Sequence, residues 1–200
     1  GYYLVELDEY YGVLSINGDT LIPVKYDYIG KPKNGFTIVE MDDEFNFADS
    51  TGKLLFQNWF ETYPEYKLLA AFQNGYCKVK FEKGYNLVDT NGTKLFKKDY
   101  EDIGPFGELI AFSKNQKWGY MNVKGQVVIQ PTFDFAQSFS DGNAIVRIEP
   151  FYGLINPKGE YIIQPYQEDI RQINDSLFLF KNLGKFGLIS SNGDTLLAPK

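Results

Sequence analysis

The sequence predicts an all-β protein made of six copies of one small antiparallel unit. Three features recur in each copy: an aromatic residue followed by a small one, a glycine six positions after the small residue, and then a short apolar segment. The small residue stands at positions 12, 46, 86, 119, 153 and 187, so the steps between copies are 34, 40, 33, 34 and 34 residues. A fixed period of this length is typical of repeat proteins, whose units bury their apolar faces against one another.

The small position after the aromatic residue accepts only glycine or asparagine. The six pairs are Tyr11-Gly12, Phe45-Asn46, Tyr85-Asn86, Trp118-Gly119, Tyr152-Gly153 and Phe186-Gly187. Glycine and asparagine tolerate positive φ best, so we interpret this position as a bulge or a close approach of two backbones beside a packed aromatic ring. The alternative is that the position must be small so that the aromatic ring can fold over it.

The second glycine of each copy indicates a tight turn between two strands. A short polar residue stands three positions before it in all six copies: Ser15, Asp49, Asp89, Asn122, Asn156 and Ser190. This spacing is typical of a type I turn that ends in a left-handed glycine. The apolar segment that follows is predicted to be a strand, and in four copies a proline ends it, at Pro23, Pro131, Pro165 and Pro199.

A further strand is expected before each aromatic–small pair. Apolar and polar residues alternate over 75–81, with Cys77, Val79 and Phe81 on one face, and the same frame places Tyr3, Val5 and Leu7 inward. Each unit is therefore predicted to be a three-stranded meander. The units cover about 1–34, 35–74, 75–106, 107–141, 142–175 and 176–200 of a single domain. Between them run connectors of about ten residues, whose apolar positions recur about every third residue and indicate one helical or 3₁₀ turn.

Two arrangements of the six units are considered. We expect an open, twisted, solenoid-like array, and the alternative is a closed six-bladed propeller. Propeller blades usually have four strands, whereas each unit here is predicted to have three. A contact between Tyr3 or Val5 and the strand at Leu196-Leu197 would indicate closure.

The step of 40 residues places an insertion in the connector between the second and third units, over 57–67. Insertions in repeat proteins fall in loops and often contribute to the binding face. Four aromatic residues of this insertion are therefore candidate binding residues: Trp59, Phe60, Tyr63 and Tyr66. The alternative interpretation is that these rings pack on the neighbouring unit.

Composition limits the chemistry that the chain can perform. The sequence has 200 residues, 44% of them hydrophobic, with a net charge of −6 and no histidine. Lack of histidine excludes a Ser-His-Asp or Cys-His catalytic site and a zinc site that uses histidine. The lone Cys77 is expected in the core, and acidic clusters such as Asp42-Asp43-Glu44 are interpreted as solvated turns, so we predict no metal and no cofactor. An acidic chain without a long apolar run is expected to bind no nucleic acid and to have no membrane span. We expect a monomer.

The unit resembles the WG-repeat family of bacterial proteins, because it shares the aromatic-Gly pair, the six-residue spacing, the apolar segment and a Pro-x-aromatic-Asp tail, as at Phe133-Asp134. The resemblance implies a β-rich array and supplies no catalytic residues. It also implies export or a place on the bacterial cell surface. We therefore predict a non-catalytic scaffold that binds a protein or a glycan. The alternative is a carboxylate-dependent hydrolase such as a glycosidase, which would need two acids about 5–10 Å apart in a cleft.

Overall fold

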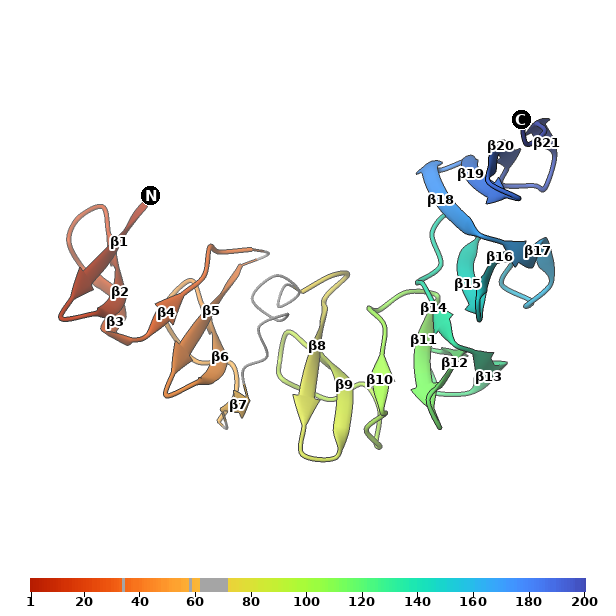
Figure 1. The fold of residues 1–200 in the computed structure, drawn as a ribbon. Coiled ribbons are helices and arrows are strands. Elements are labelled where there is room, and N and C mark those ends of the chain that lie inside the picture. The colour runs from red at the N-terminus through yellow and green to blue at the C-terminus, as the bar shows by residue number, and fades with distance from the viewer. Residues whose placement is uncertain (34, 58, 62–71) are drawn as a thin grey trace. The chain divides into compact units, whose positions relative to one another are not determined.

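The computed structural model describes residues 1–33, 35–57, 59–61 and 72–200, and these form strands and turns but no helix (Figure 1). Six small antiparallel sheets follow one another along the described chain. The prediction of an all-β tandem array of antiparallel units is therefore confirmed. The chain divides into two compact units, Gly1–Lys97 and Lys98–Lys200, and the single repeat domain stays a prediction.

The first compact unit contains three sheets. Their strands are β1 (Tyr2–Leu7), β2 (Tyr10–Ser15) and β3 (Thr20–Tyr26); β4 (Tyr28–Ile29), β5 (Phe36–Met41), β6 (Glu44–Asp49) and β7 (Phe60–Glu61); and β8 (Tyr76–Phe81) and β9 (Gly84–Asp89). In each sheet the strands are neighbours in the order in which they occur in the chain.

The second compact unit contains three sheets of four strands each. They are β10 (Asp102–Ile103), β11 (Leu109–Lys114), β12 (Lys117–Asn122) and β13 (Val127–Phe133); β14 (Phe135–Ala136), β15 (Ala144–Ile148), β16 (Phe151–Ile155) and β17 (Tyr161–Gln167); and β18 (Asp169–Asn174), β19 (Leu177–Asn182), β20 (Lys185–Ser190) and β21 (Thr195–Leu197).

The connectors that follow β3, β13 and β17 are extended and lead straight into a strand of the next sheet, which corrects the prediction of a helical or 3₁₀ turn there. β3 is separated from β4 by Asp27 alone, β13 from β14 by Asp134, and β17 from β18 by Glu168. The chain stays extended, bends at the acidic residue, and enters the next sheet as its first strand. Residues on the two sides of the bend, such as Tyr26 and Ile29, reach the same core, and this produces the spacing of three that resembled a helix. The added first strand of the second, fourth, fifth and sixth sheets begins before the predicted unit boundary.

The six predicted tight turns are present. Gly18, Gly52, Gly92, Gly125, Gly159 and Gly193 all have φ between 76° and 94°. In each turn the glycine N–H donates to the carbonyl three residues earlier, at 2.9–3.0 Å. The polar side chain at that position accepts further backbone N–H groups; the Asp49 carboxylate, for example, accepts those of Thr51 and Lys53. These contacts are local, which is why the sequence pattern was sufficient to predict them.

At the glycine that follows the aromatic residue, the backbone of a neighbouring strand approaches closely. Gly12, Gly119, Gly153 and Gly187 are absent from the positive-φ residues, so the interpretation through positive φ is wrong. The interpretation as a close approach at a bulge is confirmed, because the strand register shifts beside these glycines. A Cβ at Gly119 would lie 2.5 Å from the carbonyl oxygen of Ile129, ten residues further along the chain.

In the two copies with asparagine at this position, the side-chain amide forms hydrogen bonds across the space that glycine leaves for the opposing backbone. The Asn86 amide nitrogen donates to the Phe96 carbonyl at 2.9 Å, and its oxygen accepts from the Phe96 N–H at 3.2 Å. Asn46 makes the same pair of contacts with Phe56, at 3.0 and 3.3 Å. In these copies a side-chain amide bridges to the residue ten positions later, in place of the direct backbone approach at glycine.

Apolar cores lie between consecutive sheets within each compact unit. Val13 and Ile22 of the first sheet pack with Val39 and Ala48 of the second. Further cores of the same kind lie between the second and third, the fourth and fifth, and the fifth and sixth sheets. Within each compact unit, each sheet thus covers the next, which is the arrangement expected when a single repeat cannot bury its own apolar face.

Candidate binding surface

The acidic residues at the bends between sheets each cap a hairpin turn of the following sheet. The Asp27 carboxylate accepts the Asp42 N–H at 2.7 Å, and the Glu168 carboxylate accepts the Gly184 N–H at 3.0 Å. Glu101 accepts the N–H groups of Asn115 and Gln116, at 2.9 and 3.0 Å. These carboxylates therefore have a structural role.

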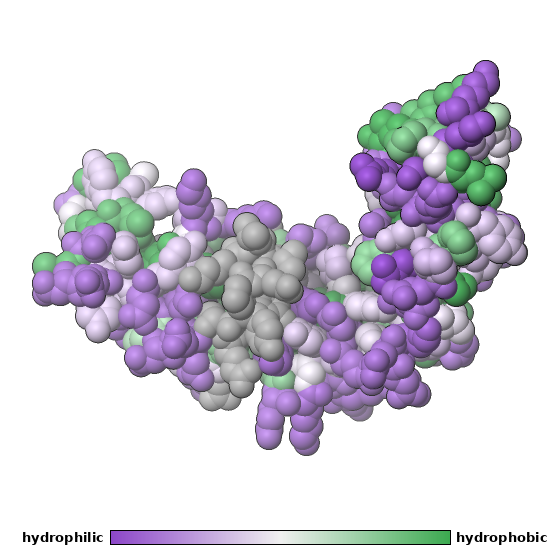
Figure 2. Space-filling model, viewed as in Figure 1, coloured by the Kyte–Doolittle hydropathy of each residue, from purple (hydrophilic) through white to green (hydrophobic). Residues whose placement is uncertain are grey.

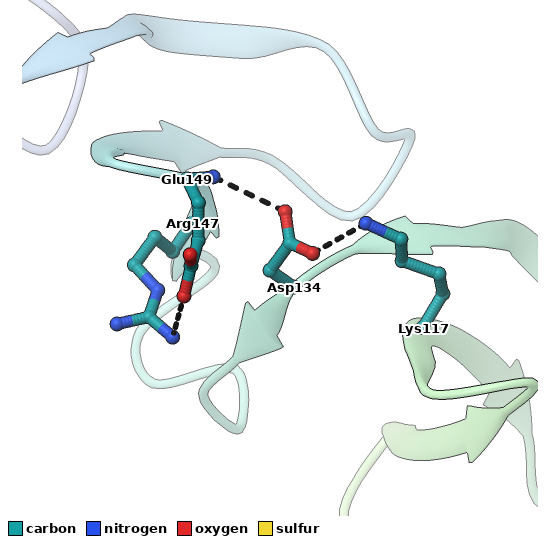
Figure 3. A network of polar contacts seen from close by, with 4 residues as sticks. All are labelled: Lys117, Asp134, Arg147 and Glu149. Atoms are coloured by element: carbon teal, nitrogen blue, oxygen red, sulfur yellow. Dashed lines mark hydrogen bonds and ion pairs between the residues drawn. The ribbon is translucent and has the colours of Figure 1, made fainter.

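The Asp134 carboxylate also contacts the preceding sheet (Figure 3). One of its oxygens accepts the Glu149 N–H at 3.1 Å, and the other is paired with the Lys117 ammonium of the preceding sheet. Arg147 is in turn paired with the Glu149 carboxylate at 2.9 Å. Asp134 thus links the hairpin of one sheet to the hairpin turn of the next.

Hydrogen bonding lowers the pKa of these carboxyl groups. The Lys117 ammonium, together with the Glu149 N–H, lowers the pKa of Asp134. Backbone N–H groups lower the pKa of Glu101 and Glu168, and the Thr51 hydroxyl lowers that of Asp49. A general acid near neutral pH needs the opposite shift.

We therefore expect the free energy of unfolding to fall in acid. A carboxyl group with a lowered folded pKa stabilises the fold fully above its unfolded pKa and loses this contribution as the pH falls through the folded value. Urea melts from about pH 6 to about pH 3 should show stability falling below about pH 5, and Asp134→Asn should reduce the slope. A slope unchanged in Asp134→Asn would contradict the assigned role of this carboxylate.

The two aromatic residues of the insertion that the structure describes, Trp59 and Phe60, lie in different surroundings. Trp59 is half-buried and contacts Tyr26, with ring centroids 6.1 Å apart, beside the core between the first two sheets. Phe60 is 9% exposed and belongs to the next core, where it contacts Phe45 and Phe56. The interpretation of Phe60 as a surface binding residue is therefore corrected: its ring fills a core. Tyr63 and Tyr66 lie outside the described residues.

Cys77 is a core residue, as the sequence predicted. Its side chain is buried between the second and third sheets, and this burial raises the pKa of the thiol to about 12. A thiol with so high a pKa is almost fully protonated near neutral pH and is a poor nucleophile. Among the described residues, no group of three or more Cys, Asp or Glu side chains is placed to hold a metal ion.

A groove that the sequence did not reveal lies between the first and second sheets. Its volume is about 450 Å³, and most of its lining is apolar, including Tyr2, Leu4, Val13, Ile22 and Phe36. Tyr2 and Leu4 come from β1, where they alternate with residues of the opposite face and point toward the second sheet. A groove that needs two sheets cannot be recognised from the pattern of one unit.

β1 is the most exposed of the strands that open a hairpin in the described sheets. Tyr3 and Leu7 are 60% and 64% exposed, so the prediction that they point into a core is wrong. In the second sheet the equivalent face is covered by the first sheet, as at Val39. Hydrophobic atoms are accordingly visible on the surface over the β1–β3 region (Figure 2).

Comparison with known proteins supports the repeat assignment. The family model described as "WG containing repeat" matches residues 11–45, 87–118, 118–149 and 152–186. No curated protein sequence matches the chain. No helix in the described part of the chain is long and apolar enough to cross a membrane.

Similar solved structures include Hsv2 of Kluyveromyces lactis, with a TM-score of 0.50 and 10% identity over 82% of this chain and 60% of that one. The chain therefore spans about three fifths of the length of that propeller-like relative. This likeness concerns the fold alone and is consistent with the alternative of a closed six-bladed propeller. PorZ of Porphyromonas gingivalis, named as a surface component of the type-IX secretion system, is similar with a TM-score of 0.40 and 8% identity, over 100% of this chain and 32% of that one.

Proposed function

Because the chain belongs to the WG containing repeat family, we propose that it is a non-catalytic binding scaffold whose partner is a protein bearing apolar side chains. The observation that carries the proposal is the apolar groove between the first two sheets, where Tyr2 and Leu4 remain about half exposed. Concave apolar sites of this size are the usual places for ligand side chains.

A protein partner fits the groove better than a glycan. A sugar offers many hydroxyl groups, and its site needs polar groups free to bind them. The Thr37 hydroxyl, which lines the groove, already donates to the Gly30 carbonyl at 2.5 Å. One oxygen of the Asp49 carboxylate, also in the lining, accepts three hydrogen bonds from Thr51 and Lys53 of its own turn. Apolar side chains need no such partners and gain free energy when water leaves the groove.

A binding role also fits the acidic residues better than a glycosidase does. A hydrolase of that kind uses one carboxyl group with a raised pKa beside a second carboxylate. The carboxylates of Glu101, Asp134 and Glu168 are instead held by turn N–H groups, and their pKa values are lowered. Export to the bacterial cell surface and a monomeric state stay predictions.

Two tyrosines of the same hairpin allow a matched test of the groove. Tyr2 and Tyr10 are 51% and 47% exposed, and only Tyr2 lines the groove. Peptides would be selected from a random phage-displayed library on the whole chain, and their affinities measured by calorimetry. Tyr2→Ala should weaken the selected peptides by about tenfold, as expected for loss of an interface aromatic, and Tyr10→Ala should leave them unchanged. Equal effects of both variants, or binding to a glycan array with no peptide selected, would contradict the proposal.

A further inference from the structure

Asparagine followed directly by glycine recurs in the turns of this chain. In such a pair the glycine nitrogen can attack the side-chain amide of the asparagine, because glycine has no Cβ to hinder the approach. The pair is therefore a place where a protein modifies itself without an enzyme. Four pairs have both residues described, and all four asparagines are exposed: Asn17-Gly18, Asn74-Gly75, Asn91-Gly92 and Asn192-Gly193. Asn34, which precedes Gly35, lies outside the described residues.

Three of these pairs lie in the tight turn of the repeat, where the glycine N–H is already engaged. Gly18, Gly92 and Gly193 each donate this N–H to the carbonyl three residues earlier, at 3.0 Å. In the same turns the N–H of the polar residue that begins the turn donates to the carbonyl four residues later, at 2.8–2.9 Å. Attack on the asparagine side chain requires the glycine nitrogen to lose its proton and turn away from its acceptor, so these bonds oppose the reaction.

Asn74-Gly75 forms a different turn, immediately before β8. Gln73 and Tyr76 exchange their backbone N–H groups across it, at 2.8 and 3.0 Å. Asn74 and Gly75 have φ of 50° and 81°, which is typical of the type I′ turn of a two-residue hairpin. Within the described part of the chain, the Gly75 N–H donates to no acceptor. The nucleophile of this pair is therefore not held by a hydrogen bond.

The fifth sheet shows that this turn accepts aspartate in place of asparagine. Asp141-Gly142 has φ of 50° and 79°, and Ser140 and Asn143 exchange their N–H groups across it at 2.9 and 3.0 Å. The same turn thus forms around an aspartate elsewhere in the chain. Isoaspartate would instead place one additional carbon in the main chain, which a closed two-residue turn cannot accommodate.

We propose that Asn74 is a site of spontaneous deamidation, that it reacts faster than the asparagines of the tight turns, and that the hairpin accepts the aspartate product. The Gly75 nitrogen gives up its proton and attacks Cγ of Asn74. The N–Cγ bond forms, the Cγ–Nδ2 bond breaks, and ammonia leaves with that proton, which gives a succinimide. Water then opens the ring at one of its two carbonyl groups, and the product is aspartate or isoaspartate, each with one new negative charge.

Peptide mapping of the intact protein measures the reaction at each pair. The 200-residue chain would be kept at mildly alkaline pH, sampled over time and digested in acid, where deamidation is slow. Mass spectrometry would then follow the four asparagine–glycine peptides separately. We expect Asn74 to react at least about fivefold faster than Asn17, Asn91 and Asn192, the factor expected for one net hydrogen bond. Equal rates at the four pairs, or a slower rate at Asn74, would overturn the proposal.

The same measurement on the chain unfolded in guanidinium chloride separates the effect of the fold from that of the local sequence. The turn hydrogen bonds are absent there, so the four pairs should react at similar rates. If Asn74 kept its full advantage in the unfolded chain, the proposal would fail, because the turn would not be the cause. Asn74 does not line the groove, so this proposal and the groove proposal can fail separately.

The variant Asn74→Asp tests whether the hairpin accepts the product. Its urea midpoint should equal that of the unmodified chain, because Asp141 already occupies the equivalent turn. A clearly lower midpoint would contradict this part of the proposal, since the turn before β8 would then require the asparagine amide.

Discussion

Gly52→Ala is expected to lower the free energy of unfolding of the first compact unit by about 3–4 kcal/mol. Gly52 has φ of 83°, which alanine adopts at a cost of about 1–2 kcal/mol. An added Cβ would also lie 1.9 Å from the carbonyl oxygen of Leu21, so the turn of the second sheet would have to move away from the first sheet. Urea denaturation followed by tryptophan fluorescence would measure the loss.

Gly18 supplies the matched control for this variant. It occupies the same turn position in the first sheet with φ of 90°, and an added Cβ there would meet nothing within 4 Å. Gly18→Ala should therefore cost only the backbone term, about 1–2 kcal/mol. The difference between the two variants measures how tightly the second sheet contacts the first. Equal losses would mean that Gly52 does not lie against the preceding sheet.

Gly119→Ala is expected to destabilise the second compact unit by about 3 kcal/mol or more, because the backbone of β13 passes directly over this glycine. A Cβ at Gly119 would lie 2.5 Å from the Ile129 carbonyl oxygen and 2.6 Å from the Pro131 nitrogen. Both contacts are with backbone, so no side-chain rotation can relieve them. Strand β13 would therefore have to shift. Thermal and urea melts of the purified variant would report the change.

Gly153 occupies the same position in the next sheet with more room. There the corresponding distances, to Ile163 and Pro165, would be 3.0 and 3.2 Å. Gly153→Ala should therefore cost about 1 kcal/mol, less than Gly119→Ala. The reverse order of the two losses would show that the approach of β13 or β17 does not determine which residues this position accepts.

The sequence predicted those features that depend on residues close together in the chain. The six tight turns follow from a polar residue and a glycine three positions apart, and the hairpins follow from alternation within single strands. The preference for glycine beside the aromatic residue was also predicted. Of the explanations offered, the close backbone approach is correct and positive φ is not. Contact with the carbonyl ten residues later decides this position, and the local φ does not.

Features that depend on the next sheet could not be predicted in this way. The acidic residues at the bends cap turns 14 to 16 residues later, so a pattern of apolar positions gave no sign of them. The same cause made the connectors resemble helical turns. Burial of Phe60 and exposure of Tyr3 both depend on which sheet covers which face, and so does the groove between the first two sheets.

Amide hydrogen exchange at Asp8 and Asp42, measured by NMR on the intact protein, tests most directly whether each bend caps the following hairpin. The two amides stand at the same place in hairpin turns of like chemistry, and only that of Asp42 has a carboxylate acceptor, on Asp27. After correction for intrinsic rates, Asp42 should exchange at least about tenfold more slowly than Asp8. Equal exchange rates at the two turns would contradict the account, because the Asp27 carboxylate would then not protect the Asp42 N–H of the following hairpin.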